Sequence, residues 1–183
     1  MRELSLNILD IAENSVKAKA ENIAIILEED DDILTFSVAD DGCGMSKELL
    51  EKVTDPFTTT SEIRKVGLGI PFLKLAAEQT GGSITISSEK GTGTEIKAVF
   101  NKKHIDFTPL GDVISTVVTL VHGSPETDIV FSHTMNGKKK GRVYFSTKEI
   151  RNALGDIRLN APDVLRWIRE YLLDLYGGAE VSF

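Results

Sequence analysis

The chain has 183 residues, of which 41% are hydrophobic and 27% are charged, a composition typical of soluble globular proteins. The formal net charge of −7 argues against a nucleic-acid surface, because phosphate binding needs a basic face. A single cysteine excludes an internal disulfide, no signal peptide is visible, and no apolar run could span a bilayer, so we expect a cytoplasmic protein without a membrane segment.

The first half of the chain shows helix and strand patterns in turn. Apolar residues recur at helical intervals over residues 3–18, which predicts an amphipathic helix. Two strands follow over 23–27 and 33–39, and the acidic run between them predicts a solvated turn. Ser46 is expected to cap a short helix that runs to Val53.

A polar segment, residues 54–65, predicts a loop before the next helix. Pro71 suits the first turn of that helix, which is expected to run to about Gln79 and to end at Gly81-Gly82. Alternating patterns over 83–88 and 94–100 predict two more strands.

A change in composition at 101–103 predicts a boundary between a domain of residues 1–103 and a second of residues 104–183. In the second we expect three strands and two helices, a small α+β unit. The strands are predicted over 113–121, 128–135 and 142–146, and the helices over 147–154, capped by Thr147, and 162–176. The apolar stripe of the last helix either packs on its own sheet or forms a dimer or partner interface.

Polar residues on the first predicted helix fall on one face. Asp10, Asn14 and Lys17 are spaced i, i+4 and i+7, which brings their side chains together. Asn is a poor helix former, so its position within a largely apolar helix calls for a reason. An amide oxygen there suits Mg²⁺, a hard cation that prefers oxygen ligands.

Two glycine-rich stretches lie beside predicted elements. Asp40 ends an apolar strand and is followed by a loop with Gly42 and Gly44, where the backbone can approach a ligand or simply turn. Gly67-Leu68-Gly69 precedes a helix, and backbone N–H groups of such a turn suit phosphate oxygens. Cys43, between two of the glycines, is interpreted as a small residue in a tight loop.

Four motifs occur in a fixed order: D-I-A-E-N-S-V-K from Asp10, D-D-G-C-G-M from Asp40, V-G-L-G-I from Val66 and G-T-G-T from Gly91. Together they resemble the nucleotide site of the GHKL ATPase superfamily, which includes histidine kinases. The resemblance covers about residues 4–100, and no Walker P-loop motif competes with it. It implies the Bergerat fold for residues 1–103, an α+β two-layer sandwich with a mixed, largely antiparallel sheet and helices on one face.

The resemblance also implies a site for ATP and Mg²⁺. Asp40 matches the residue that accepts a hydrogen bond from the adenine amine, Asn14 the metal ligand, and Asp10 a general base. Further cofactor-binding positions implied by the motifs are Lys17, Gly42, Gly44, Lys65, Gly67, Leu68, Gly69 and Thr94. The stretch Asp55-Pro56-Phe57-Thr58-Thr59-Thr60 resembles a phenylalanine-containing box of histidine kinases, and Arg64 and Lys65 fall in what resembles their ATP lid.

The resemblance leaves three functions open. Because the predicted ATP domain begins at the first residue, with no phosphoacceptor helix pair before it, we expect a kinase that phosphorylates a partner protein in trans. The string His104-Ile105-Asp106-Phe107-Thr108-Pro109-Leu110 is similar to a phosphoacceptor box but follows the ATP domain, and we interpret the match as coincidence. The alternatives are an ATP-gated protein-binding module and a slow ATPase coupled to dimerisation.

Overall fold

The computed structural model describes residues 3–54, 68–155 and 157–177. Within these ranges the strands form one six-stranded sheet in the order β3-β4-β2-β1-β5-β6. The elements follow in this order: α1 (Leu4–Lys17), β1 (Asn22–Glu29), β2 (Ile33–Asp40), α2 (Lys47–Lys52), α4 (Gly69–Gln79), β3 (Ser83–Glu89), β4 (Gly93–Asn101), α5 (Val113–Gly123), β5 (Asp128–Asn136), β6 (Lys140–Ser146), α6 (Thr147–Leu154) and α7 (Pro162–Gly177).

The sheet is mixed, and most of its neighbouring strands run antiparallel. β1 and β2 form a hairpin, whose turn is held by the Asp30 carboxylate accepting hydrogen bonds from the backbone N–H groups of Asp32 and Ile33. β2 pairs with β4, β4 with β3, and β5 with β6, all antiparallel, whereas β1 and β5 run parallel. The predicted solvated turn and the predicted strand pairs of the first half are therefore confirmed.

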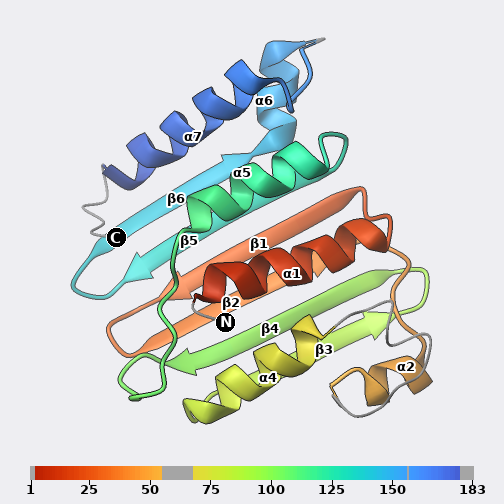
Figure 1. The fold of residues 1–183 in the computed structure, drawn as a ribbon, viewed down its shortest axis with the longest axis vertical. Coiled ribbons are helices and arrows are strands. Elements are labelled where there is room, and N and C mark those ends of the chain that lie inside the picture. Colours follow the sequence, from red (N-terminus) through yellow and green to blue (C-terminus); the bar gives the residue numbers. More distant parts are fainter. Residues whose placement is uncertain (1–2, 55–67, 156, 178–183) are drawn as a thin grey trace.

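Helices α1, α4, α5 and α7 lie over one face of the sheet (Figure 1). Strand side chains alternate between buried and more exposed positions, as in β1, where Ile23, Ile25 and Leu27 are buried and Ile26 and Glu28 are exposed. A sheet covered on one side needs this alternation, because successive side chains point to opposite faces. This architecture confirms the predicted α+β fold, a two-layer sandwich with a mixed, largely antiparallel sheet.

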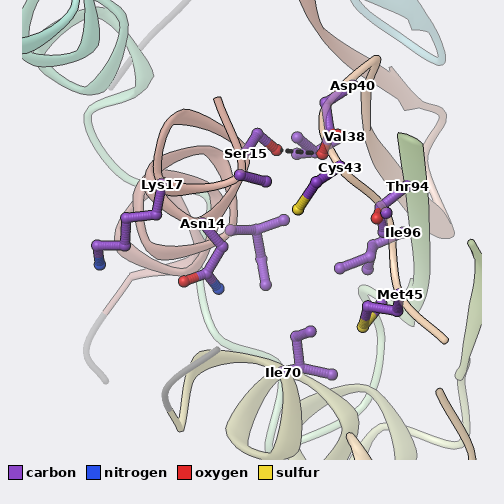
Figure 2. A pocket seen from close by; sticks show the side chains of 13 residues that line it. Asn14, Ser15, Lys17, Val38, Asp40, Cys43, Met45, Ile70, Thr94 and Ile96 are labelled. Atoms are coloured by element: carbon purple, nitrogen blue, oxygen red, sulfur yellow. Dashed lines mark hydrogen bonds between the residues drawn. The ribbon is translucent and has the colours of Figure 1, made fainter. Parts of the chain in front are cut away.

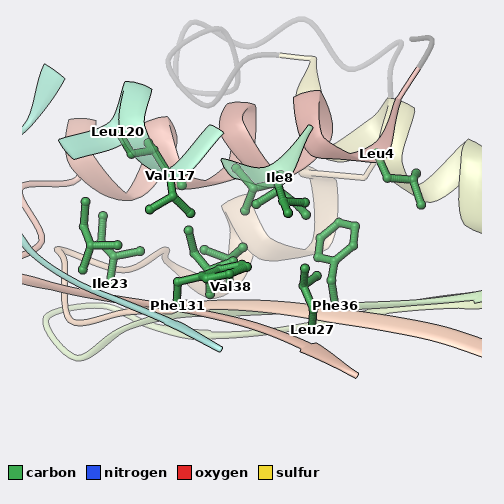
Figure 3. Close-up of a cluster of buried hydrophobic side chains, with 14 of the residues drawn as sticks. Leu4, Ile8, Ile23, Leu27, Phe36, Val38, Val117, Leu120 and Phe131 are labelled. Atoms are coloured by element: carbon green, nitrogen blue, oxygen red, sulfur yellow. The ribbon is translucent and has the colours of Figure 1, made fainter. Parts of the chain in front are cut away.

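The core lies between the helices and the sheet (Figure 3). Leu4 and Ile8 of α1 and Val117 and Leu120 of α5 face the side chains of β1, β2 and β5. Phe36 of β2 stacks on Phe100 of β4 at 5.9 Å between ring centroids, and both rings are fully buried. Large apolar side chains from both halves of the chain thus share one core.

Residues 104–177 continue the sheet of the first half, because β5 pairs with β1. The described part of this segment has two strands and three helices, and the strand predicted over Val113–Val121 is wrong: these residues form α5. Its buried side chains recur with helical spacing, and Asp112 caps it by accepting hydrogen bonds from the N–H and hydroxyl of Ser115. A short apolar run rich in β-branched residues does not distinguish a strand from a buried helix. The predicted domain boundary at 103/104 stays a prediction.

Three further details differ from the sequence predictions or were left open. Helix α4 begins at Gly69, two residues before Pro71. The cap of α6 is Ser146, whose hydroxyl accepts from the N–H of Glu149, whereas the buried Thr147 hydroxyl accepts from the N–H of Ile129. On α7, Val164, Ile168 and Leu172 are buried, so its apolar stripe packs on the chain itself, against α5 and β6.

The segment after β4, residues 102–112, which contains His104, has no helical structure. Its backbone makes short turns, and His104 Nδ1 accepts a hydrogen bond from the N–H of Asp106 at 3.2 Å. In the described ranges no helix is both long and apolar enough to cross a membrane.

A charged network joins β1, β5 and the end of β4. The Glu29 carboxylate lies 2.7 Å from Nζ of Lys102 and 3.3 Å from Nε2 of the buried His133. His133 Nδ1 lies 2.8 Å from the Tyr176 hydroxyl of α7. The His133 ring lowers the pKa of Glu29 by more than burial raises it, and with the help of Lys102 the value falls to about 2.

The lowered pKa of Glu29 leads to a prediction about the stability of the protein in acid. A carboxyl group whose pKa is lower in the folded than in the unfolded chain stabilises the fold above its unfolded pKa, and that stabilisation disappears as the pH falls toward the folded pKa. We expect the difference in unfolding free energy between the wild type and Glu29→Gln to be largest above pH 4.5 and to shrink between pH 4.5 and about 2. Urea unfolding at a series of pH values measures it.

Glu28→Gln is the matched control, because Glu28 is the exposed neighbour on the other face of β1. A difference in unfolding free energy between the wild type and Glu29→Gln that stays constant with pH would contradict the assignment.

Candidate functional site

A cavity of about 220 Å³ lies between α1, the end of β2 and the start of α4 (Figure 2). Asn14 and Lys17 of α1, Asp40 of β2, Gly44 of the loop after β2 and Thr94 of β4 all line it. The structure therefore brings together residues from all four sequence motifs, because Ile70, the last residue of V-G-L-G-I, also lines the cavity. The remaining walls are largely apolar: Ile11, Val38, Met45, Ile70 and Ile96.

Asp40 stands at the end of β2 with its carboxylate held in place by the protein. Its Oδ2 accepts a hydrogen bond of 2.6 Å from the hydroxyl of Ser15, and its Oδ1 accepts one of 2.9 Å from the N–H of Gly42. A carboxylate offers about four acceptor positions, so acceptor capacity remains for a ligand. An adenine amine would be one such donor.

Ser15 was not among the predicted site residues. It is 3% exposed, on the buried side of α1, next to Asn14. The signal was present in the sequence, because serine favours caps and turns over helix interiors unless its hydroxyl has a partner. Its partner is Asp40, which lies far along the chain, so the pairing itself could not be predicted.

Asp41, the next residue, serves the fold. It accepts hydrogen bonds from the backbone N–H of Glu21 and from both the backbone and side-chain N–H groups of Asn22. These bonds lower the pKa of Asp41, the side-chain bond from Asn22 most of all. Of the two adjacent carboxylates, Asp40 faces the cavity and Asp41 holds the strand ends together.

The loop after Asp41 is fixed between α1 and the turn that joins β3 to β4. The N–H of Cys43 donates to the carbonyl of Ala18, and the carbonyl of Cys43 accepts from the N–H of Gly91. The exposed Cys43 also lines the cavity, and its sulfur points into it in Figure 2. The backbone hydrogen bond between Cys43 and Gly91 therefore holds the motif of Asp40 against the motif of Gly91.

Two glycines are required by the fold at this junction. Gly44 has φ of +61°, and a Cβ built on it would lie 2.0 Å from the carbonyl oxygen of Glu89. Gly93 has φ of +131°, and its Cβ would lie 1.9 Å from the carbonyl oxygen of Asp40. Thr94, directly after it, shares a hydrogen bond of 2.9 Å with the hydroxyl of Ser88.

Asp10 lies one turn before Asn14 on α1, close to the first residue of α4. A Cβ built on Gly69 would lie 3.7 Å from Oδ2 of Asp10. Burial, and to a smaller extent the charge of Glu13, raise the pKa of Asp10, against the opposing effect of Lys17. A raised pKa makes this carboxylate a stronger base than an ordinary aspartate.

The other predicted residues take different positions. Lys17 is 63% exposed, lies 3.7 Å from Oε2 of Glu13, and leaves α1 on the side away from Thr94 and Ile96 in Figure 2. Leu68 is exposed and directly precedes α4. Lys65, Gly67, Arg64 and the Asp55–Thr60 stretch lie outside the described residues.

The donor set of the cavity is compatible with magnesium. Asn14 is half-buried, lines the cavity and offers an amide oxygen, and the exposed Asp10 carboxylate stands one turn away on the same helix. Oxygen donors are those that Mg²⁺ prefers, and the metal keeps several waters when the protein supplies few ligands. The roles of the individual residues stay predictions.

The family model described as histidine kinase-, DNA gyrase B- and HSP90-like ATPase matches residues 2–104. The chain is 38% identical over 84 residues to the sensor kinase CckA of Brucella abortus, covering 43% of this chain and 9% of that protein. It is 36% identical over 91 residues to sporulation kinase D of Bacillus subtilis, covering 49% and 18%. A putative sensor histidine kinase, NtrY-like, of Rickettsia conorii is 28% identical over 107 residues, covering 58% and 18%.

The chain belongs to the histidine kinase-, DNA gyrase B- and HSP90-like ATPase family, as its motifs predicted. It therefore contains an ATP-binding domain of the histidine-kinase-like type. The matched segments span less than a fifth of the length of these relatives.

The tight junction at Gly44 generates a stability prediction. Gly44→Ala adds a clash with the Glu89 carbonyl to the strain of a positive φ, whereas Gly91→Ala, at φ of +84° with open space around it, adds the strain alone. We expect Gly91→Ala to cost about 1–2 kcal/mol of unfolding free energy and Gly44→Ala clearly more. Denaturant unfolding of both variants measures the difference. Equal losses of unfolding free energy in the two variants would show that the loop accommodates the methyl group at position 44 at no further energetic cost.

Proposed function

We propose that the chain binds Mg-ATP in the cavity around Asp40 and transfers its γ-phosphoryl group to a partner protein, in the manner of a histidine-kinase-like enzyme. The observation that carries the ATP site is the convergence of Asn14, Ser15, Asp40 and Thr94 on one apolar-walled cavity. A purine needs such apolar walls with a few fixed polar groups. Asp40, held in place by Ser15, would accept a hydrogen bond from the adenine amine.

The phosphates would extend from this cavity toward Asp10 and the first residues of α4. The first N–H groups of an α-helix have no intrahelical acceptor and carry partial positive charge, which favours phosphate oxygens. Asn14, with Asp10 beside it, would hold Mg²⁺ through oxygen atoms. When bound, the metal would offset the negative charge of the phosphate groups during transfer.

Asp10 would act as the general base toward the attacking group. Its raised pKa and its position near Gly69, at the start of α4, support this role. Asn14 and Asp10 of α1, and after them Gly69 at the start of α4, would then line the path from adenine to the transferred phosphoryl group.

Transfer to another molecule is supported by the position of His104. Thr94, at the cavity, and Asn101 stand near opposite ends of β4, and a strand of that length spans roughly 20 Å. His104 follows Asn101 and so lies at the far end of the sheet from the cavity. The histidine with the phosphoacceptor-like sequence is therefore far from the proposed ATP site of its own chain, which favours an acceptor elsewhere.

The first test separates binding from chemistry. We expect Asp40→Asn to weaken ATP binding by about 10- to 100-fold, because an amide cannot replace the carboxylate as acceptor on both oxygens. Asp41→Asn should leave ATP affinity near that of the wild type, because Asp41 faces away from the cavity. Calorimetric titration with Mg-ATP measures both. Equal affinity loss in the two variants would contradict the assignment of Asp40.

The second test addresses the reaction. With γ-labelled ATP, Mg²⁺ and an extract of the source cell, we expect label on a partner protein, and a loss of about 100-fold or more in labelling rate for Asp10→Asn with ATP affinity retained. Glu13→Gln, on the exposed neighbour, is the control. If label reaches no protein while free phosphate accumulates, the chain is an ATPase; if neither occurs, it is a nucleotide-gated binding module.

A further inference from the structure

A second and larger cavity, of about 620 Å³, lies at the opposite end of β1 from the nucleotide site. Glu29, at the last residue of β1, lines it, whereas Ile23, near the first, pairs with Asp40. Along a strand these ends are roughly 20 Å apart. The cavity is therefore separate from the proposed ATP site and is formed mainly by residues outside the family match.

The cavity is formed by three parts of the chain that converge on β1 and β5. The segment 109–112 is fixed to the start of α1, because the N–H groups of Leu4 and Ser5 donate to the carbonyls of Pro109 and Leu110. The start of α5 and the last turns of α7 complete the walls. This size falls in the range of sites that enclose small organic ligands.

One end of this cavity is polar and buried. His133, 2% exposed, has its Nδ1 2.8 Å from the Tyr176 hydroxyl, and its Nε2 lies 3.3 Å from Oε1 of Glu29. The Glu29 carboxylate is partly exposed and faces the cavity. Its pKa of about 2 keeps it ionised in neutral solution. The rest of the wall is mostly apolar: Pro109, Leu110, Val113, Ile114 and Leu173.

More acidic than basic side chains line the cavity. Glu3, Glu29 and Asp112 are acids, and the bases among the described lining residues are Arg169 and the imidazole of His133. Arg169 lies 3.8 Å from Asp112, so the two offset each other at the rim. Lys102 offsets part of the charge of Glu29 from outside the cavity. An anionic ligand would meet an excess of carboxylates in an apolar setting, where charges interact strongly.

We propose that this cavity is a second ligand site, which takes a small organic amine: a protonated amino group directed to Glu29 and an apolar body against the walls of α5 and α7. Such a ligand matches both the excess of acid and the apolar lining. A metal ion is the weaker match, because in the described ranges no three His, Cys, Asp or Glu side chains are grouped so that they could hold one. The inference does not depend on the proposed kinase function.

The test uses three probes of one shape and different charge: 2-phenylethylamine, 2-phenylethanol and phenylacetate. We expect the purified full chain, without nucleotide, to bind the amine at least about tenfold more tightly than the alcohol or the acid, as measured by calorimetry or ligand-observed NMR. Equal or tighter binding of the acid, or no saturable binding of any probe, would overturn the proposal.

Two matched tryptophan variants locate the site. Leu173 is 41% exposed on α7 at the cavity wall, and Leu75 is 52% exposed on α4, away from it. We expect Leu173→Trp to abolish amine binding by filling the cavity and Leu75→Trp to leave it unchanged, with thermal unfolding as the check that both variants fold. Glu29→Gln should lower amine affinity about tenfold. Amine binding that persists in Leu173→Trp, or that ATP displaces competitively, would contradict the assignment.

Discussion

The burial of one side of α1 against β1 and β2 is the constraint on which the rest of the molecule depends. Ile8, Ile11 and Ala12 are in the core, and the 3.6-residue period of the helix then decides which neighbours remain accessible. Asn14 stands at the edge of the buried stripe and lines the cavity, and Asp10 stands one turn before it on the same helix. Hydrophobic packing therefore fixes the position of the polar groups, and a rigid helix holds them more accurately than a loop would.

At the end of β2, two adjacent carboxylates make different contacts. The strand ends at Asp40, and the chain turns away at Asp41, so the two carboxylates have different partners. Asp40 is fixed by Ser15 and Gly42 and remains open to the cavity, whereas Asp41 has its oxygens occupied by Glu21 and Asn22. The hydrogen-bond partners thus distinguish the carboxylate that is open to the cavity from the one that is engaged within the fold.

Much of this arrangement could be predicted from local sequence signals. Clear periods, caps and turns located α1, β1, β2, β3 and β4 to within one or two residues, and the motifs identified the family and some of the residues that line the cavity, among them Asn14, Asp40 and Thr94. The run at Val113 was mistaken for a strand because β-branched residues favour strands, while the deciding contacts come from packing against α1 and α7. The overlooked signal was Asp112, a strong N-cap residue.

Other features could not be predicted because they depend on contacts between distant residues. The Ser15–Asp40 bond joins a helix and a strand, and the second cavity combines Glu3, Glu29, His133 and Tyr176, which share no motif. In the same way, the pairing of β5 with β1 carries no local signature. Composition alone suggested a boundary at 103, yet β1 from before it and β5 from after it are neighbours in one sheet.

The parallel pairing of β1 with β5 has a consequence for the order in which the chain is made. The hairpin partner of β1, β2, follows it directly in the chain, whereas β5, which covers the other edge of β1, is synthesised about a hundred residues later. Until then the nascent chain carries an open strand edge rich in isoleucine, a template for pairing between molecules. By pairing with β1, β5 removes this edge as a site for aggregation. A fragment of the chain that ended before β5 would keep the edge of β1 unpaired.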